Sequence, residues 1–127
     1  MVAAGQEEGQ YLLSIEDIPS AAGPRFPAYF VGSTAPNNVE DGVGKVANPQ
    51  LKIDKIADFL VSAEDPELLI AVHGYNTALG QFAEGDTPGD GVKGWYQEIR
   101  DHIDTRCDRR SSGFMFLGYR WPSEEIN

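Results

Sequence analysis

The sequence predicts an α/β fold in which helices flank a parallel sheet. Two segments, residues 68–72 and 114–121, have the apolar character of strands, and the first contains no polar residue at all. An unbroken apolar run of this kind is typical of a parallel strand that is covered on both faces. Helical patterns precede the first run and separate it from the second, and this alternation characterises α/β proteins. The chain has 127 residues, enough for one domain with one core.

The first helix is predicted between Asn48-Pro49 and Asp65-Pro66. Asparagine is a favoured N-cap, proline fits the first helical turn, and the residue before a further proline leaves the helical conformation. A helix that leads into the strand at residues 68–72 is the order expected of an α/β fold. The apolar residues of this segment fall on one helical face: Ile53, Ile56, Phe59, Leu60 and Ala63.

The second helix is predicted at residues 92–107. Trp95, Ile99 and Ile103 are spaced four residues apart and form one stripe, which we expect to contact the core, with Tyr96 beside it. His102 lies off this stripe and is expected at the surface. The helix joins the two apolar strands in a βαβ unit.

The remaining segments are less regular. Residues 1–27 are expected to be an irregular N-terminal segment, in which residues 11–15 form either a short strand or one helical turn. Residues 28–32 have β-forming side chains and a closing glycine, so a further strand is predicted there. Residues 80–94 are rich in glycine and overlap a helical turn expected at 78–83. This long loop is either a tolerated surface insertion or a functional segment such as a lid.

Composition excludes several classes of function. The formal net charge of −10 repels phosphate backbones, so nucleic acid is not an expected partner. No apolar run approaches the roughly 20 residues of a membrane-spanning helix, and the N-terminus lacks the basic and apolar regions of a signal peptide. The single cysteine, Cys107, cannot form an internal disulfide, which favours a reducing compartment, the cytoplasm. No histidine, cysteine and carboxylate set has the spacing of a metal site, and no cofactor is expected.

Polar and aromatic residues follow both apolar strands. His73-Gly74-Tyr75-Asn76 comes directly after the first, and Trp121-Pro122-Ser123 ends the second. The carboxyl ends of the strands are where open α/β sheets bind ligands. The two motifs, in this order and with a helix between them, resemble the oxyanion loop and the next strand of a bacterial branch of the α/β-hydrolase superfamily. The resemblance covers roughly the second half of the chain.

The resemblance implies a partial α/β-hydrolase-type parallel sheet flanked by helices. Residues 1–127 would be the N-terminal part of one such domain, with the sheet and helices in residues 28–127. The implied function is that of the N-terminal portion of a serine hydrolase, which cleaves an ester, thioester or amide in a small-molecule or acyl substrate. In this family the loop after the third strand supplies a backbone N–H that binds the oxyanion of the tetrahedral intermediate.

The matching loop assigns four residues to this oxyanion site. Tyr75 would contribute the N–H donor. Gly74 would let the backbone approach the substrate, because a residue without a Cβ can take a positive φ. His73 would orient the loop through bonds from its ring to nearby backbone, and Asn76 would hold the loop through its side chain.

Trp121 and Ser123 are assigned to the substrate pocket, where Trp121 either walls the acyl site or caps the core under the loop. The family's nucleophile, in a Gly-x-Ser-x-Gly turn, has no match in this sequence, and neither its acid nor its catalytic histidine can be assigned. The alternative to a hydrolase is therefore a non-catalytic α/β binding module or a truncated relic. A few parallel strands leave a bare edge, so we expect the chain to be prone to association, although the sequence indicates no particular oligomeric state.

Overall fold

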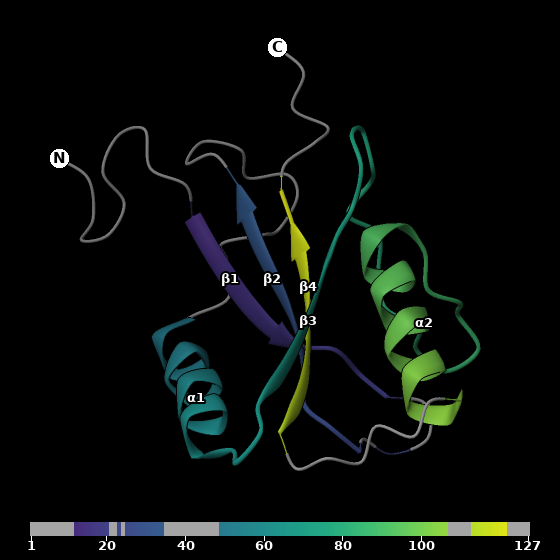
Figure 1. Cartoon of the computed structure of the whole chain (residues 1–127). Coiled ribbons are helices and arrows are strands. Elements are labelled where there is room, and N and C mark those ends of the chain that lie inside the picture. Colours follow the sequence, from purple (N-terminus) through teal and green to yellow (C-terminus); the bar gives the residue numbers. More distant parts are fainter. Residues whose placement is uncertain (1–11, 21–22, 24, 35–48, 107–112, 122–127) are drawn as a thin grey trace, which may run out of the picture.

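The computed structural model describes residues 12–20, 23, 25–34, 49–106 and 113–121 (Figure 1). Asn48, the predicted N-cap, lies outside these ranges, as do Cys107 and Ser123. The helices and the later strands lie close to their predicted positions. The elements are β1 Leu12–Asp17, β2 Ala28–Thr34, α1 Pro49–Ser62, β3 Glu67–Val72, α2 Gly91–Arg106 and β4 Phe114–Arg120.

The four strands form one mixed sheet in the order β1-β2-β4-β3. The strands β2, β3 and β4 run parallel, whereas β1 pairs antiparallel with β2. The α/β class is confirmed, but the expectation of a wholly parallel sheet is wrong. Residues 1–27, expected to be irregular overall, contain the strand β1, so of the two alternatives for residues 11–15 the strand is confirmed and the helical turn is not. β1 and β2 pair antiparallel because the connection between them is short, whereas a parallel pair requires a crossover of a dozen or more residues, usually a helix.

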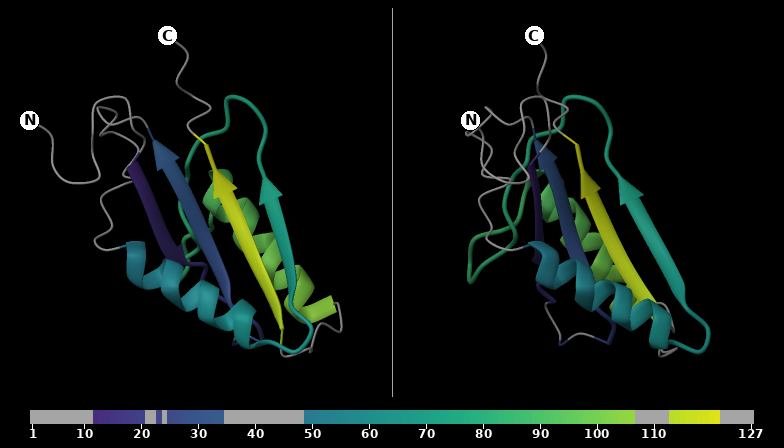
Figure 2. Two further views of the ribbon diagram at one scale, coloured as in Figure 1. Left: turned by 60° about the vertical axis from the view of Figure 1, so that its left-hand side comes forward. Right: turned by 90° about the vertical axis from the view of Figure 1, so that its left-hand side faces the viewer.

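The two helices cover opposite faces of the sheet (Figure 2). α2 connects β3 to β4 on one face, and α1 packs against β1 on the other. An ion pair ties α1 to the end of β1, with Lys52 Nζ 3.0 Å from an oxygen of Asp17. No residue of α1 is fully buried, so this helix is the more loosely attached of the two.

The main core lies between α2 and the centre of the sheet. Phe30 of β2, Phe116 of β4, and Val92 and Tyr96 of α2 are all buried there. The Tyr96 ring packs against both phenylalanines, with centroids 6.0 Å from Phe30 and 6.3 Å from Phe116. Gly118 of β4 makes room for this ring, because a Cβ at that position would lie 2.2 Å from Tyr96 Cδ2.

The buried side of α2 differs from the predicted stripe. Ile99 and Ile103 pack against the core as predicted, but Trp95 is 52% exposed and Tyr96 only 1%. The prediction for Trp95 is therefore wrong. The space above Gly118 selects Tyr96 for burial, and the adjacent residue then points roughly 100° away around the helix. His102 is exposed, as predicted.

β3 forms an edge of the described sheet, and its apolar side chains are not covered. Leu68, Ile70 and Val72 on one face are 42%, 54% and 61% exposed, and Leu69 on the other face is 42% exposed. The prediction that this run is covered on both faces is wrong for the described part of the chain. β4 pairs with one side of β3, while α1 packs at the opposite edge of the sheet.

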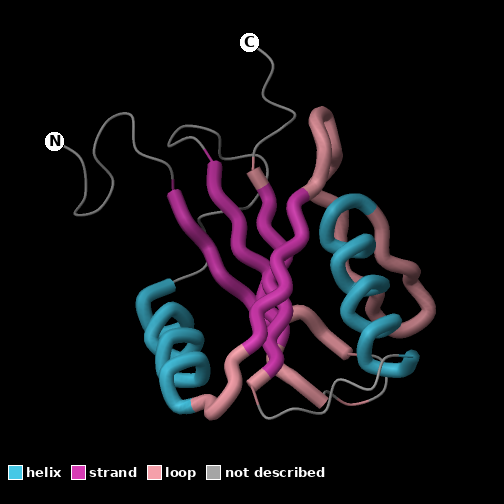
Figure 3. Tube along the Cα trace, in the orientation of Figure 1, coloured by secondary structure: helices cyan, strands magenta, loops and turns pink. Residues whose placement is uncertain are grey.

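The glycine-rich connection after β3 is a compact hairpin that runs along α2, drawn as a loop in Figure 3. Gln81 and Asp90 exchange backbone hydrogen bonds of 3.1 and 3.0 Å, and Glu84 and Thr87 pair in the same way nearer the tip. The helical turn expected at residues 78–83 is absent, because Gly80 has a φ of +71° and leaves the helical conformation.

This hairpin contributes to the core. The Phe82 ring meets the Phe30 ring edge-on, with centroids 6.1 Å apart. The Ala83 N–H donates a hydrogen bond of 2.7 Å to Oε1 of Gln97, a buried side chain of α2. Of the two roles left open by the sequence, neither a passive insertion nor a lid describes these contacts, since the loop covers the sheet beside α2.

Candidate functional site

The two motifs singled out in the sequence meet at the carboxyl ends of neighbouring strands. β3 and β4 are parallel and in register from Glu67 opposite Phe114 to Val72 opposite Tyr119. His73 therefore begins its loop beside the residues that end β4, and Trp121 lies next to it. This edge of an α/β sheet is the expected position for a ligand site.

His73 and Trp121 clamp the two strand ends together. Their rings stack with centroids 5.5 Å apart and planes within 6°. The Trp121 indole N–H donates to the His73 carbonyl at 3.1 Å, and the Trp121 backbone N–H donates to His73 Nε2 at 3.2 Å. These contacts make Trp121 a support of the loop after β3.

The second ring nitrogen of His73 bonds within the loop. Nδ1 lies 2.7 Å from the Gly74 carbonyl oxygen, which can only accept, so this contact requires a proton on Nδ1. Nε2 lies 3.2 Å from the Trp121 backbone nitrogen and 3.1 Å from the Trp121 carbonyl oxygen, so it faces a donor and an acceptor of the same residue. The imidazole is buried and both of its nitrogens are engaged. In this arrangement the His73 ring links the loop after β3 to the end of β4.

The Gly74–Tyr75 peptide is held in a defined orientation. Its carbonyl accepts from His73 Nδ1 at 2.7 Å and from Thr77 Oγ1 at 3.0 Å. In a planar trans peptide the N–H points opposite to the carbonyl. The Tyr75 N–H is therefore directed away from both donors, and it has no hydrogen-bond partner among the residues that the structure describes.

The turn of the loop is made by Asn76, not by Gly74. Asn76 has a φ of 58°, in the left-handed region that asparagine tolerates better than most residues. Gly74 does not have a positive φ, and a Cβ on it would meet nothing within 4 Å. Gly74 thus does not use the positive φ that is open to a glycine, and the open space around it leaves room for a ligand.

Tyr96 supports the same strand ends from below, a role that the sequence pattern did not reveal. Its hydroxyl donates to the Tyr119 carbonyl at 2.5 Å. Burial raises the pKa of the Tyr96 phenol to about 12, and a hydrogen bond with the His73 backbone lowers it in part. The sequence signal that could have indicated Tyr96 is its spacing of four residues from Val92, which places both on one face of the helix. In the structure this face is directed at Gly118.

This pKa predicts how stability depends on alkaline pH. The phenol ionises near 10.0 when exposed and near 12 in the native state, so between these values the unfolded chain binds fewer protons than the native one. We therefore expect the stabilisation from Tyr96 to be complete below pH 10 and to be lost progressively up to about pH 12. Urea unfolding at a series of pH values should show this loss in the native sequence and not in Tyr96→Phe. Equal slopes in the two proteins would contradict the assignment.

Two further predicted site residues are Tyr75 and Ser123. Tyr75 is exposed, and its ring lies 6.5 Å from that of Trp121. Ser123 belongs to the part of the chain that is not described. Within the described ranges, no cluster of three or more histidine, cysteine or carboxylate side chains is placed to hold a metal, and neither helix is long and apolar enough to cross a membrane.

Compared with known protein families, with curated proteins and with solved structures, the chain matches none.

Proposed function

We propose that the His73 loop is the oxyanion-binding loop of a serine hydrolase, of which this chain is the N-terminal portion. The enzyme would cleave an ester, a thioester or an amide. The observation that carries the proposal is the Tyr75 N–H, which is unpaired within the described structure and is fixed in direction by two hydrogen bonds to the Gly74 carbonyl. It follows the third strand of the sheet, where the α/β-hydrolase fold has its oxyanion donor.

The proposed chemistry is stabilisation of a developing negative charge. When a nucleophile attacks an acyl carbon, its carbonyl oxygen becomes an oxyanion that needs donors already in place. Losing one such donor costs about 2.7–4 kcal/mol of transition-state stabilisation. His73, Thr77 and Trp121 hold the loop, so the Tyr75 N–H would not have to reorganise during the reaction. The nucleophile, the acid and the base would come from outside residues 1–127.

The uncovered edge of β3 is the position that the proposal assigns to the nucleophile-bearing strand. The donor and the nucleophile must both lie about 3 Å from the reacting group. β4 already occupies one side of β3, so the strand that carries the nucleophile would pair with the other side. The exposed side chains of Leu68, Ile70 and Val72 would then be covered by the elements that accompany that strand.

The first test is the native protein in extracts of its own cells. It would be captured with antibodies against this chain, its intact mass measured, and its reaction with a serine-directed fluorophosphonate recorded. We expect a mass well above 13.9 kDa and a labelled serine. A native mass of 13.9 kDa, or a larger protein that the probe does not label, would contradict the hydrolase and favour the non-catalytic module or the relic.

Gly74→Val in the complete protein separates catalysis from folding. A Cβ at residue 74 has open space in the fold, so thermal stability should be unchanged, but the branched side chain would occupy the approach to the Tyr75 N–H. We expect kcat on a nitrophenyl ester to fall about 100-fold, with a smaller change in KM. Val61→Ala, at an exposed position of α1, is the control. Unchanged turnover in Gly74→Val would remove the loop from the mechanism.

A further inference from the structure

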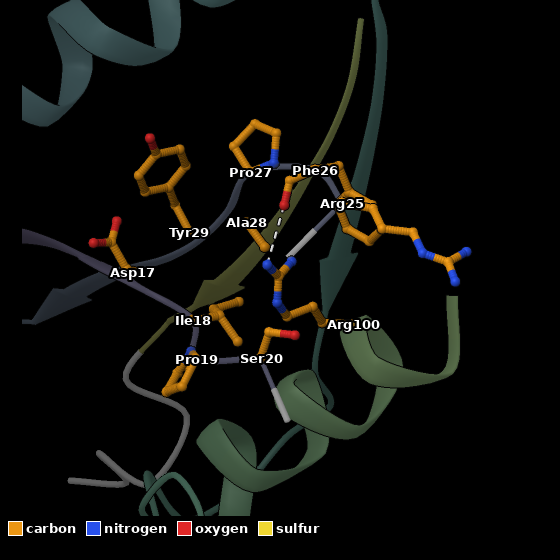
Figure 4. A pocket seen from close by; sticks show the side chains of 10 residues that line it. All are labelled: Asp17, Ile18, Pro19, Ser20, Arg25, Phe26, Pro27, Ala28, Tyr29 and Arg100. Atoms are coloured by element: carbon orange, nitrogen blue, oxygen red, sulfur yellow. Dashed lines mark hydrogen bonds between the residues drawn. The ribbon is translucent and has the colours of Figure 1, made fainter. Parts of the chain in front are cut away.

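A second feature with the properties of a binding site lies at the opposite end of the sheet from the His73 loop. A cavity of about 510 Å³ opens where β1 ends, β2 begins and α2 passes over them (Figure 4). This volume is within the range of small-molecule sites. The lining is mixed: it combines apolar side chains, among them Ile18, Phe26, Ala28 and Tyr29, with the polar or charged residues Asp17, Ser20, Arg25 and Arg100.

Arg100 is the unusual member of this lining. Its side chain is only 2% exposed, and Nη2 donates to the Phe26 carbonyl at 3.0 Å. The guanidinium also lies over the Phe26 ring, 5.0 Å from its centroid. Nε and Nη1 are buried without a hydrogen-bond partner in the described structure. Leaving a buried donor of a charged group unpaired costs several kcal/mol, so the unpaired Nε and Nη1 of Arg100 call for an explanation.

The acidic groups near Arg100 are engaged elsewhere. Asp104, one turn later on α2, accepts from the Ser20 hydroxyl and from the Arg25 backbone N–H, both at 3.2 Å. Asp17 forms its ion pair with Lys52. Burial lowers the pKa of Arg100, and the nearby Asp104, Asp101 and Asp17 oppose this shift. These carboxylates favour the charged form of Arg100 but make no hydrogen bond with Nε or Nη1, which are left without a partner among the described residues.

We propose that this cavity binds the carboxylate of a small organic acid whose remaining part is apolar. Arg100 would donate to the carboxylate, since a planar guanidinium matches the geometry of that group. The apolar part would lie against Ile18, Ala28 and Tyr29. A phosphate fits less well, because its higher charge would be repelled more strongly by the Asp17 carboxylate in the lining and needs more donors than the single buried arginine provides. Nε and Nη1 are covered in the unliganded chain, so the proposal requires the Arg100 side chain to turn toward the cavity when the ligand binds.

The unaltered chain provides the first test, with phenylacetate as the probe and phenylacetamide as its uncharged counterpart. Binding is followed by nuclear magnetic resonance, including the arginine Nε–H signals. We expect saturable binding of phenylacetate, a shift of one arginine Nε–H signal, and at least tenfold weaker binding of the amide. Equal affinities, or no saturable binding of the acid within its solubility, would overturn the proposal.

Two variants locate the site. Arg100→Gln should weaken phenylacetate binding at least tenfold, whereas Arg106→Gln, exposed on the same helix and outside the cavity, should leave it unchanged. Equal weakening in both would mean nonspecific attraction to positive charge and would overturn the proposal. The acid–amide comparison needs no substitution, so it decides the matter even if Arg100→Gln fails to fold. The result is independent of the hydrolase proposal, because the two sites lie at opposite ends of the sheet.

Discussion

Gly118→Ala should lower the free energy of unfolding by about 3 kcal/mol, the upper end of what overpacked cores usually lose. The added Cβ would lie 2.2, 2.6 and 2.8 Å from three carbon atoms of the Tyr96 ring. The ring cannot withdraw freely, because it is packed between Phe30 and Phe116 and its hydroxyl is bonded to the Tyr119 carbonyl. Urea unfolding measures the loss, and the midpoint of thermal unfolding should fall by roughly 10 °C.

Gly74→Ala is the matched control for this experiment. It adds the same methyl group after the neighbouring strand, at a position with no positive φ and nothing within 4 Å. Its effect should stay within about 0.5 kcal/mol. Comparable losses in the two variants would show that the Tyr96 ring does not depend on the absence of a side chain at residue 118.

Gly80→Ala should be as damaging, by a different route. Gly80 has a φ of +71°, which costs an alanine about 1–2 kcal/mol. Its Cβ would also lie 1.9 Å from the Asp90 carbonyl oxygen, which is backbone and cannot move without opening the hairpin. We expect a total loss of about 3 kcal/mol in thermal or urea unfolding, because Phe82 would lose its place against Phe30.

Gly85→Ala separates the two contributions. Gly85 also has a positive φ, of +59°, but its Cβ would meet nothing within 4 Å. This variant should lose only the conformational cost, about 1 kcal/mol. If both alanines cost the same, the close approach of Gly80 to Asp90 would be absorbed by the loop and would not matter for stability.

The positions of the helices and the later strands could be read from the sequence because local rules determine them. Proline near residue 49 and the apolar spacing of α1 and α2 are local signals, and so are the strand-forming runs of β2, β3 and β4. The exposure of β3 could not be read in this way. An apolar run indicates that burial is favourable, but the neighbour that buries it is a property of the whole sheet. Trp95 was predicted to be in the core in place of Tyr96 for the same reason, since Gly118, the residue that decides which of the two is buried, lies on another element.

In the candidate site, too, the features set by local sequence could be predicted and those set by distant residues could not. The loop at residues 73–76 and its proximity to Trp121 follow from two strand ends and parallel pairing, so the sequence was sufficient to bring them together. A positive φ was considered only at Gly74, because glycine is the usual choice, whereas the structure has it at Asn76, a residue type that also tolerates that conformation. Arg100 carried no local signal, because its burial depends on Phe26, which is far away in the sequence.

The strand order has a consequence for how the protein is made. β4 lies between β2 and β3, and those two strands do not pair with each other. A nascent chain that has emerged from the ribosome only as far as residue 113 can form the β1–β2 pair, while β3 has no partner. Pairing between segments so far apart in the chain is slow, and exposed apolar strands are bound by chaperones or attacked by proteases in the meantime. Translation that pauses before β4 should therefore reduce the yield of the protein more than a pause at any other element.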